Sequence, residues 1–68
     1  MNEEVFNMEI RKFLKKVGVQ SQRKIEQAVK QSIEKGSLVG TEKLEASVLL
    51  QVPSVGLKAS IEGKIKLD

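Results

Sequence analysis

The side chains that most often do acid, base or nucleophilic chemistry are nearly absent from this chain. It contains no His, Cys, Tyr or Trp, and its one Asp is the last residue, Asp68. Histidine is the side chain best poised to exchange a proton near neutral pH, and cysteine, as its thiolate, is a strong nucleophile. A Glu beside a Lys or Ser could still act, but no paired arrangement stands out. The sequence therefore predicts a protein that is not an enzyme and that uses no metal or cofactor.

The cationic residues are the other chemistry-bearing set, and they are unevenly placed. Residues 1–10 carry three Glu and no cation (0 − 3 = −3), whereas residues 11–35 carry eight Lys or Arg against two Glu (8 − 2 = +6). Such a segment can contact phosphates. The candidate phosphate or nucleic-acid contacts are Arg11, Lys12, Lys15, Lys16, Arg23 and Lys30.

A helix-turn-helix reading of residues 13–25 makes nucleic-acid binding the alternative function. Gly18 stands where that motif has a turn glycine, and an apolar residue follows it. Against this, the spacing from Val19 to Ile25 is about one residue too long, and Leu14 is bulky where a small residue is usual. No aromatic residue stands on the exposed side of the helix that carries the basic residues, so a platform for stacking on bases is missing. Solvated lysines that complement a helix end explain the same charges.

The elements that position these residues follow from a change in apolar spacing. Apolar residues recur three and four apart up to Gly36 and every second residue after Gly40, which is the change from helix to strand periodicity. The first part predicts helices over about 3–17 and 22–35, with Gly18 closing the first and Ser21 capping the second. The expected helical core is Phe6, Ile10, Phe13, Leu14, Val17, Ile25, Val29 and Ile33.

The second part predicts an antiparallel β-hairpin over about 42–52 and 57–67. A four-residue loop from Pro53 to Gly56 brings the two apolar sets to one face. It also sets Glu45 opposite Lys64, an opposite-charge pair that supports this register. The predicted fold is α+β in the order α-α-β-β, a two-helix hairpin packed on a β-hairpin, as a single domain over residues 1–68.

The apolar residues outside these faces indicate where a partner binds. Residues 46–52 contain no charge, so the edge of the strand at 43–52 is poorly protected against pairing with another chain. We therefore expect a non-catalytic protein-interaction module that binds a protein partner or itself, as a possible homodimer through this strand. The candidate partner-binding residues are Val5, Met8, Leu49 and Val55.

The run from Met1 to Val29, and above all residues 5–29 with the segment Val-Gly-Val-Gln-Ser-Gln-Arg, resembles a family of small uncharacterised bacterial proteins. The resemblance implies a fold and a protein that exists on its own, but no activity, cofactor or partner. The acidic start and the lack of a ~20-residue apolar run predict a cytoplasmic protein with no membrane span.

Overall fold

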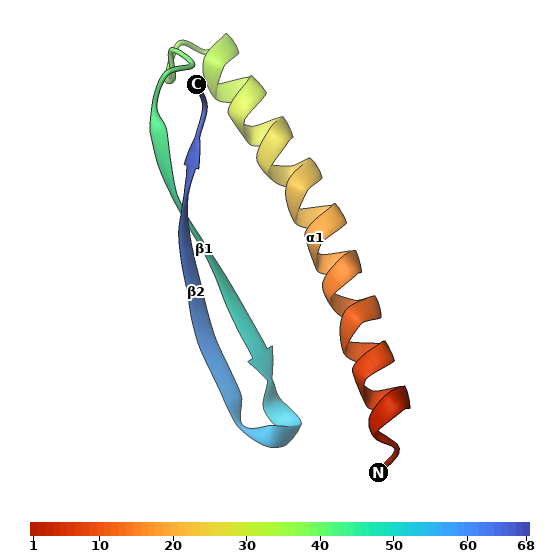
Figure 1. The fold of residues 1–68 in the computed structure, drawn as a ribbon. Coiled ribbons are helices and arrows are strands. Elements are labelled where there is room, and N and C mark those ends of the chain that lie inside the picture. The colour runs from red at the N-terminus through yellow and green to blue at the C-terminus, as the bar shows by residue number, and fades with distance from the viewer. The chain divides into compact units, whose positions relative to one another are not determined.

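The computed structural model describes residues 1–68 and divides them into two units, Met1–Ser37 and Leu38–Asp68. The first is a single helix, α1, and the second is a hairpin of two strands, β1 and β2, joined by the short 3-10 helix η1 (Figure 1). The prediction of one domain over the whole chain stays a prediction.

Helix α1 runs from Glu3 to Glu34, and both of its ends are capped. At the start, the Val5 N–H donates to the Oδ1 of Asn2 at 3.1 Å, which satisfies one of the free N–H groups of the first turn. At the end, Gly36 adopts a left-handed φ of 80°. The N–H groups of Gly36 and Ser37 donate to the carbonyls of Ile33 and Ser32, as in a Schellman motif.

The prediction of two helices, 3–17 and 22–35 in a helical hairpin, is wrong, because α1 is continuous through Gly18 and Ser21. Gly18 has no positive φ and therefore does not close a helix. One glycine costs a helix only about 1 kcal/mol relative to alanine, and no proline stands in this region to enforce a break. The positions Val17, Ser21 and Ile25 also continue one face, so nothing in the apolar pattern requires a change of direction.

The hairpin matches the predicted strands and register. Strand β1 covers Lys43–Val52 and β2 covers Leu57–Lys66, antiparallel, with η1 at Pro53–Val55. Gly56 takes a left-handed φ of 65°, and its N–H donates to the Pro53 carbonyl at 3.0 Å. The expected pair of Glu45 with Lys64 is present. The apolar sets also meet on one face, as expected, in the pairs Val52 with Leu57, Leu50 with Ala59, Val48 with Ile61 and Leu44 with Ile65.

Neither unit contains a buried core, since a lone helix and a two-stranded ribbon each lack a second layer. No side chain in either unit is buried. The residues expected to form the helical core are half-exposed; Phe6 is 49%, Phe13 51% and Leu14 50% exposed. Their assignment to a buried layer is therefore corrected, and each unit presents an apolar face instead.

Candidate interaction surfaces

The outer edge of β1 is the first candidate surface. The sheet has only two strands, so each strand has one edge whose backbone N–H and C=O groups pair with no neighbouring strand of the sheet. Strand β1 carries Lys43 and Glu45 near its start and no charge from Ala46 onward. Strand β2 has charges along its length: Lys58, Glu62, Lys64 and Lys66. The edge of β1 is therefore the less protected one.

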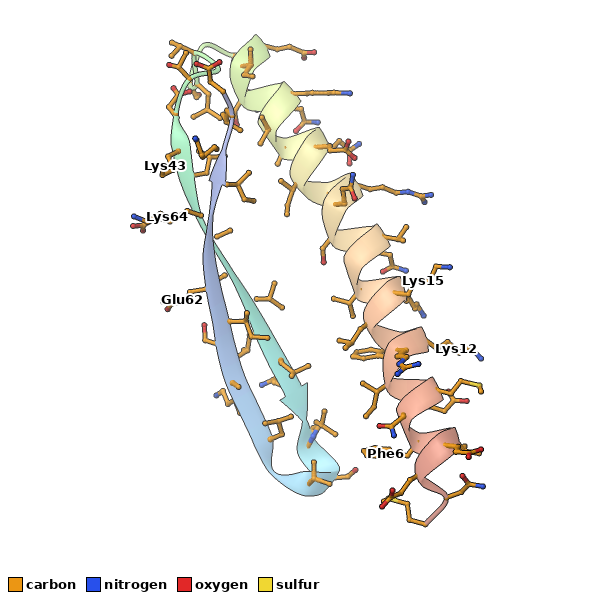
Figure 2. The ribbon with its side chains drawn as sticks, in the orientation of Figure 1. Phe6, Lys12, Lys15, Lys43, Glu62 and Lys64 are labelled. Carbon is orange, nitrogen blue, oxygen red and sulfur yellow. The ribbon has the colours of Figure 1, made fainter.

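Leu49 lies in the uncharged part of β1 and is 57% exposed. Its cross-strand partner is Ser60, which places it on the polar face of the hairpin. Side chains on that face otherwise end in polar groups, as with Glu62 and Lys64, which extend from the same side of β2 (Figure 2). A large apolar side chain in this position adds to the hazard of an unprotected edge.

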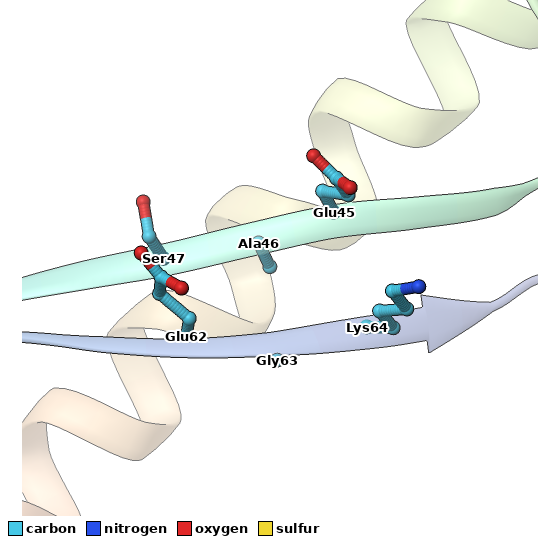
Figure 3. Close-up of a pocket in the computed structure, with 6 residues that line it drawn as sticks. All are labelled: Glu45, Ala46, Ser47, Glu62, Gly63 and Lys64. Carbon is cyan, nitrogen blue, oxygen red and sulfur yellow. The ribbon is translucent and has the colours of Figure 1, made fainter.

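A shallow hollow lies on the polar face of the hairpin, next to Leu49 along the strands. It is lined by Glu45, Ala46, Ser47, Glu62, Gly63 and Lys64 (Figure 3). It arises where the smallest cross-strand pair, Ala46 with Gly63, leaves the ribbon thin. Two carboxylates and one ammonium group surround it, with no side chain buried there. We find no paired chemistry in it beyond the cross-strand pair of Glu45 and Lys64.

The four predicted partner-binding residues are divided between the two units. Val5 and Met8 lie one turn apart on α1, 53% and 67% exposed. Leu49 is in β1, and Val55, 74% exposed, is in η1 at the turn of the hairpin. Each of the four is exposed, but only Val5 and Met8 are neighbours within one element.

The predicted phosphate contacts all lie on α1 and are all exposed. At about 100° per residue, Lys12, Lys16, Arg23 and Lys30 project within about 40° of one another, and Lys15 lies near them. Lys12 and Lys15 extend from the side of α1 opposite to Phe6 (Figure 2). Because α1 is continuous, Lys12, Lys15, Lys16, Arg23 and Lys30 form one face along a single helix and not the two halves of a helix-turn-helix. Arg11 projects about 100° from Lys12 and lies off this face.

The carboxylate of Glu42 has a role that the sequence did not suggest. It accepts the N–H groups of Val39 at 2.8 Å, Gly40 at 2.9 Å and Thr41 at 3.1 Å. These bonds, that of Val39 above all, hold the pKa of the Glu42 carboxyl below its usual value, although partial desolvation opposes the shift. The sequence signal for this role was a glutamate two residues after a glycine, Gly40. In the structure that glycine has a φ of 98°.

The structure shows neither a cluster of metal-binding side chains nor a helix that could cross a membrane. No group of three or more His, Cys, Asp or Glu side chains is arranged to hold a metal ion. No helix combines the length and the apolarity that a bilayer crossing requires.

Comparison with known proteins gives one match. The family model described as a family of unknown function, DUF6494, matches residues 1–68. No curated protein matches the chain, and no solved structure matches it.

Proposed function

Because the chain belongs to the family of unknown function DUF6494, we propose its role from its own surfaces: it is a non-catalytic protein-interaction module that self-associates through the edge of β1. The observation that carries the proposal is the unpaired edge of β1, uncharged from Ala46 to Val52. A second copy can add its own β1 there and continue the sheet.

Symmetry makes a second copy a suitable partner for this edge. Two β1 strands related by a twofold axis run antiparallel, so each contributes the same residues to the contact. A register centred on Val48 pairs Ala46 with Leu50 and Leu44 with the partner's Val52, which keeps the apolar faces together. That register also sets Glu45 opposite Gln51, so no like charges are opposed.

The size of the chain supports self-association as well. A domain of 68 residues buries only about 60% of the surface of its unfolded chain, which leaves little margin for stability. Disulfides are excluded because the chain has no cysteine. Oligomerisation is the common remaining way to add buried apolar area.

The substitution Leu49→Lys tests the edge. A lysine in the middle of an edge strand disfavours addition of a further strand, because its charge must be desolvated or opposed. We expect sedimentation equilibrium to give a dimer or larger mass for the unsubstituted protein and a lower mass for Leu49→Lys.

Ser60→Lys is the matched control, since Ser60 is the cross-strand partner of Leu49 on β2 and takes the same charge on the same face. It should leave the mass unchanged. A monomer mass for the unsubstituted protein at high concentration, or equal losses in both variants, would contradict the proposal.

A second function, binding of nucleic acid, is favoured by one observation, the single basic face of α1. Cationic side chains on one continuous helix can follow a phosphate backbone more directly than those on two helices at an angle. The lack of aromatic residues on this face argues against recognition of single strands by stacking. We place this function second for that reason.

A further inference from the structure

The apolar stripe of α1 has a repeat that the two-helix interpretation concealed. Phe6, Val17 and Ala28 are eleven residues apart, and so are Ile10, Ser21 and Ser32. Leu14 and Ile25 form a third row of the same spacing. Eleven residues in three turns give 3.67 residues per turn, close to the 3.6 of a straight helix. The stripe therefore stays on one side of α1 and drifts by only about 20° per repeat.

This stripe is long enough to need an elongated partner. From Phe6 to Ser32 it spans about 39 Å at 1.5 Å per residue. The apolar face of a hairpin like this one, from Leu44 to Val52, spans about 26 Å at 3.3 Å per residue. A hairpin thus matches about two thirds of the stripe, whereas a second α1 matches all of it.

The sizes of the side chains select an antiparallel second copy. The first half of the stripe is bulky, whereas the second half has small residues at Ser21, Ala28 and Ser32. If two copies pair so that facing residue numbers add to 38, each of these small residues faces a large one. The facing pairs are Phe6 with Ser32, Ile10 with Ala28, Val17 with Ser21, Phe13 with Ile25 and Leu14 with Lys24. The aliphatic stem of Lys24 can lie along Leu14 while its ammonium group reaches solvent.

A parallel pair would place Phe6 against Phe6 and Ser32 against Ser32, with overpacking at one end and gaps at the other. Alternation of large and small residues across an interface is what allows side chains to fill the space between elements. Side-chain volume therefore favours the antiparallel arrangement along the whole helix.

The charges on the stripe favour the same arrangement. Glu3 stands eleven residues before Leu14, and Lys35 stands twenty-two after Phe13, so both lie in line with the stripe. In the antiparallel register Glu3 of each copy faces Lys35 of the other, whereas a parallel pair would oppose Glu3 to Glu3. The helix dipoles are also better opposed than aligned.

We infer that α1 binds α1 of a second copy of this chain, antiparallel, through the stripe that begins at Phe6 and ends at Ser32. The inference rests on the proposed self-association and adds a second contact surface to the edge of β1. It assigns the half-exposed apolar residues of the stripe, among them Phe6, Phe13 and Leu14, to an intermolecular interface.

Disulfide trapping tests the orientation directly, because the chain has no cysteine of its own. Glu3→Cys protein is mixed with isotope-labelled Lys35→Cys protein under mild oxidation, and cross-linked species are identified by mass. We expect the mixed 3–35 dimer. Neither variant alone should cross-link efficiently, since equivalent ends of an antiparallel pair are about 48 Å apart. A 3–3 dimer from Glu3→Cys alone, or no cross-link at all, would overturn the inference.

Val17→Lys and Val19→Lys form a matched pair for the stripe itself. Both place one lysine near the middle of α1, but the two positions are about 200° apart around the helix. Added to the cysteine-bearing chains, Val17→Lys should abolish the 3–35 cross-link, whereas Val19→Lys should leave it, with circular dichroism confirming equal helix content. Equal cross-linking in both would overturn the stripe as the interface.

The same cross-link separates this inference from the proposed edge. In a Leu49→Lys background we expect the 3–35 cross-link to persist, because β1 does not contribute to it. If Leu49→Lys lowers the mass of the assembly but no 3–35 cross-link forms in any variant, the edge stands and the helical interface falls. If the cross-link forms but Leu49→Lys leaves the mass unchanged, the helical interface stands and the edge of β1 falls.

Discussion

The backbone just before β1 changes the chemistry of the Glu42 carboxyl group. Three successive N–H groups converge on its carboxylate, so this side chain orders the backbone from Val39 to Thr41 just before β1 begins. A carboxylate that accepts several backbone N–H groups is favoured in its charged form. The Glu42 side chain therefore sets the geometry of the loop. The three N–H groups are occupied by its carboxylate and do not face a ligand.

Protonation of Glu42 should release this loop. Its pKa is lowered in the folded chain, so its contribution is present at neutral pH, above the unfolded value, and is lost as pH falls through the folded pKa. We expect the amide NMR signals of Val39, Gly40 and Thr41 to titrate together, at a pH below the usual range of a glutamate carboxyl.

Glu42→Gln should remove that titration and speed amide exchange at the same three residues at pH 7, because a neutral amide accepts hydrogen bonds less strongly. Glu45→Gln is the control, since Glu45 lies outside the loop and its substitution should change neither. Unchanged exchange in Glu42→Gln would show that the carboxylate does not hold the loop.

At the scale of the elements, the strands were predictable and the helix boundary was not. Strand register follows from a period of two, because a slip of one residue would turn Val48 and Ile61 to the other face. The left-handed glycine Gly56 then closes the turn between them. The prediction of a helix boundary at Gly18 depended instead on the helix propensity of glycine. Glycine is only about 1 kcal/mol less favourable than alanine inside a helix, and a long helix tolerates that cost.

Gly18→Ala distinguishes a continuous helix from a corner. A Cβ at this position meets no atom within 4 Å, and alanine is the better helix former, so we expect unfolding to be about 0.5–1 kcal/mol less favourable. Urea denaturation followed by circular dichroism at 222 nm measures the change. Gly56→Ala should act in the opposite direction, since its φ is positive. Destabilisation by Gly18→Ala would instead indicate a turn at that residue.

At the scale of the whole molecule, the charges are separated along one helix. The net charge is +3, but the first ten residues are acidic and the excess of cations lies in residues 11–35. The apolar stripe and the basic face of α1 project to different sides, so pairing through the stripe leaves Lys12 and Lys30 in solvent. Self-association and phosphate contacts are thus compatible on the same helix.

The salt dependence of binding tests whether the basic face of α1 binds nucleic acid. We expect fluorescence anisotropy to show only weak binding of mixed-sequence duplex DNA or RNA at low salt, lost near 0.15 M, because non-specific contacts are released by competing counterions. Lys12→Glu with Lys15→Glu should remove even this residual binding, whereas Lys58→Glu on β2 should not. Saturable binding that persists at 0.15 M salt would raise nucleic-acid binding above self-association.

The sequence by itself determined the local structure: a helical start near residue 3, a helical end near residue 35, and both strands with their register. These depend on neighbouring residues or on periodicity, which a single sequence displays. The tertiary structure decided that residues 3–34 form one helix and that Phe6, Phe13 and Leu14 remain half-exposed in their unit. A sequence shows that these residues are apolar, but whether they meet a second layer of the same chain or another molecule depends on how many elements that chain can stack. One helix and two strands are too few to enclose a core within either unit, so the faces that were expected to be buried became the candidate interfaces.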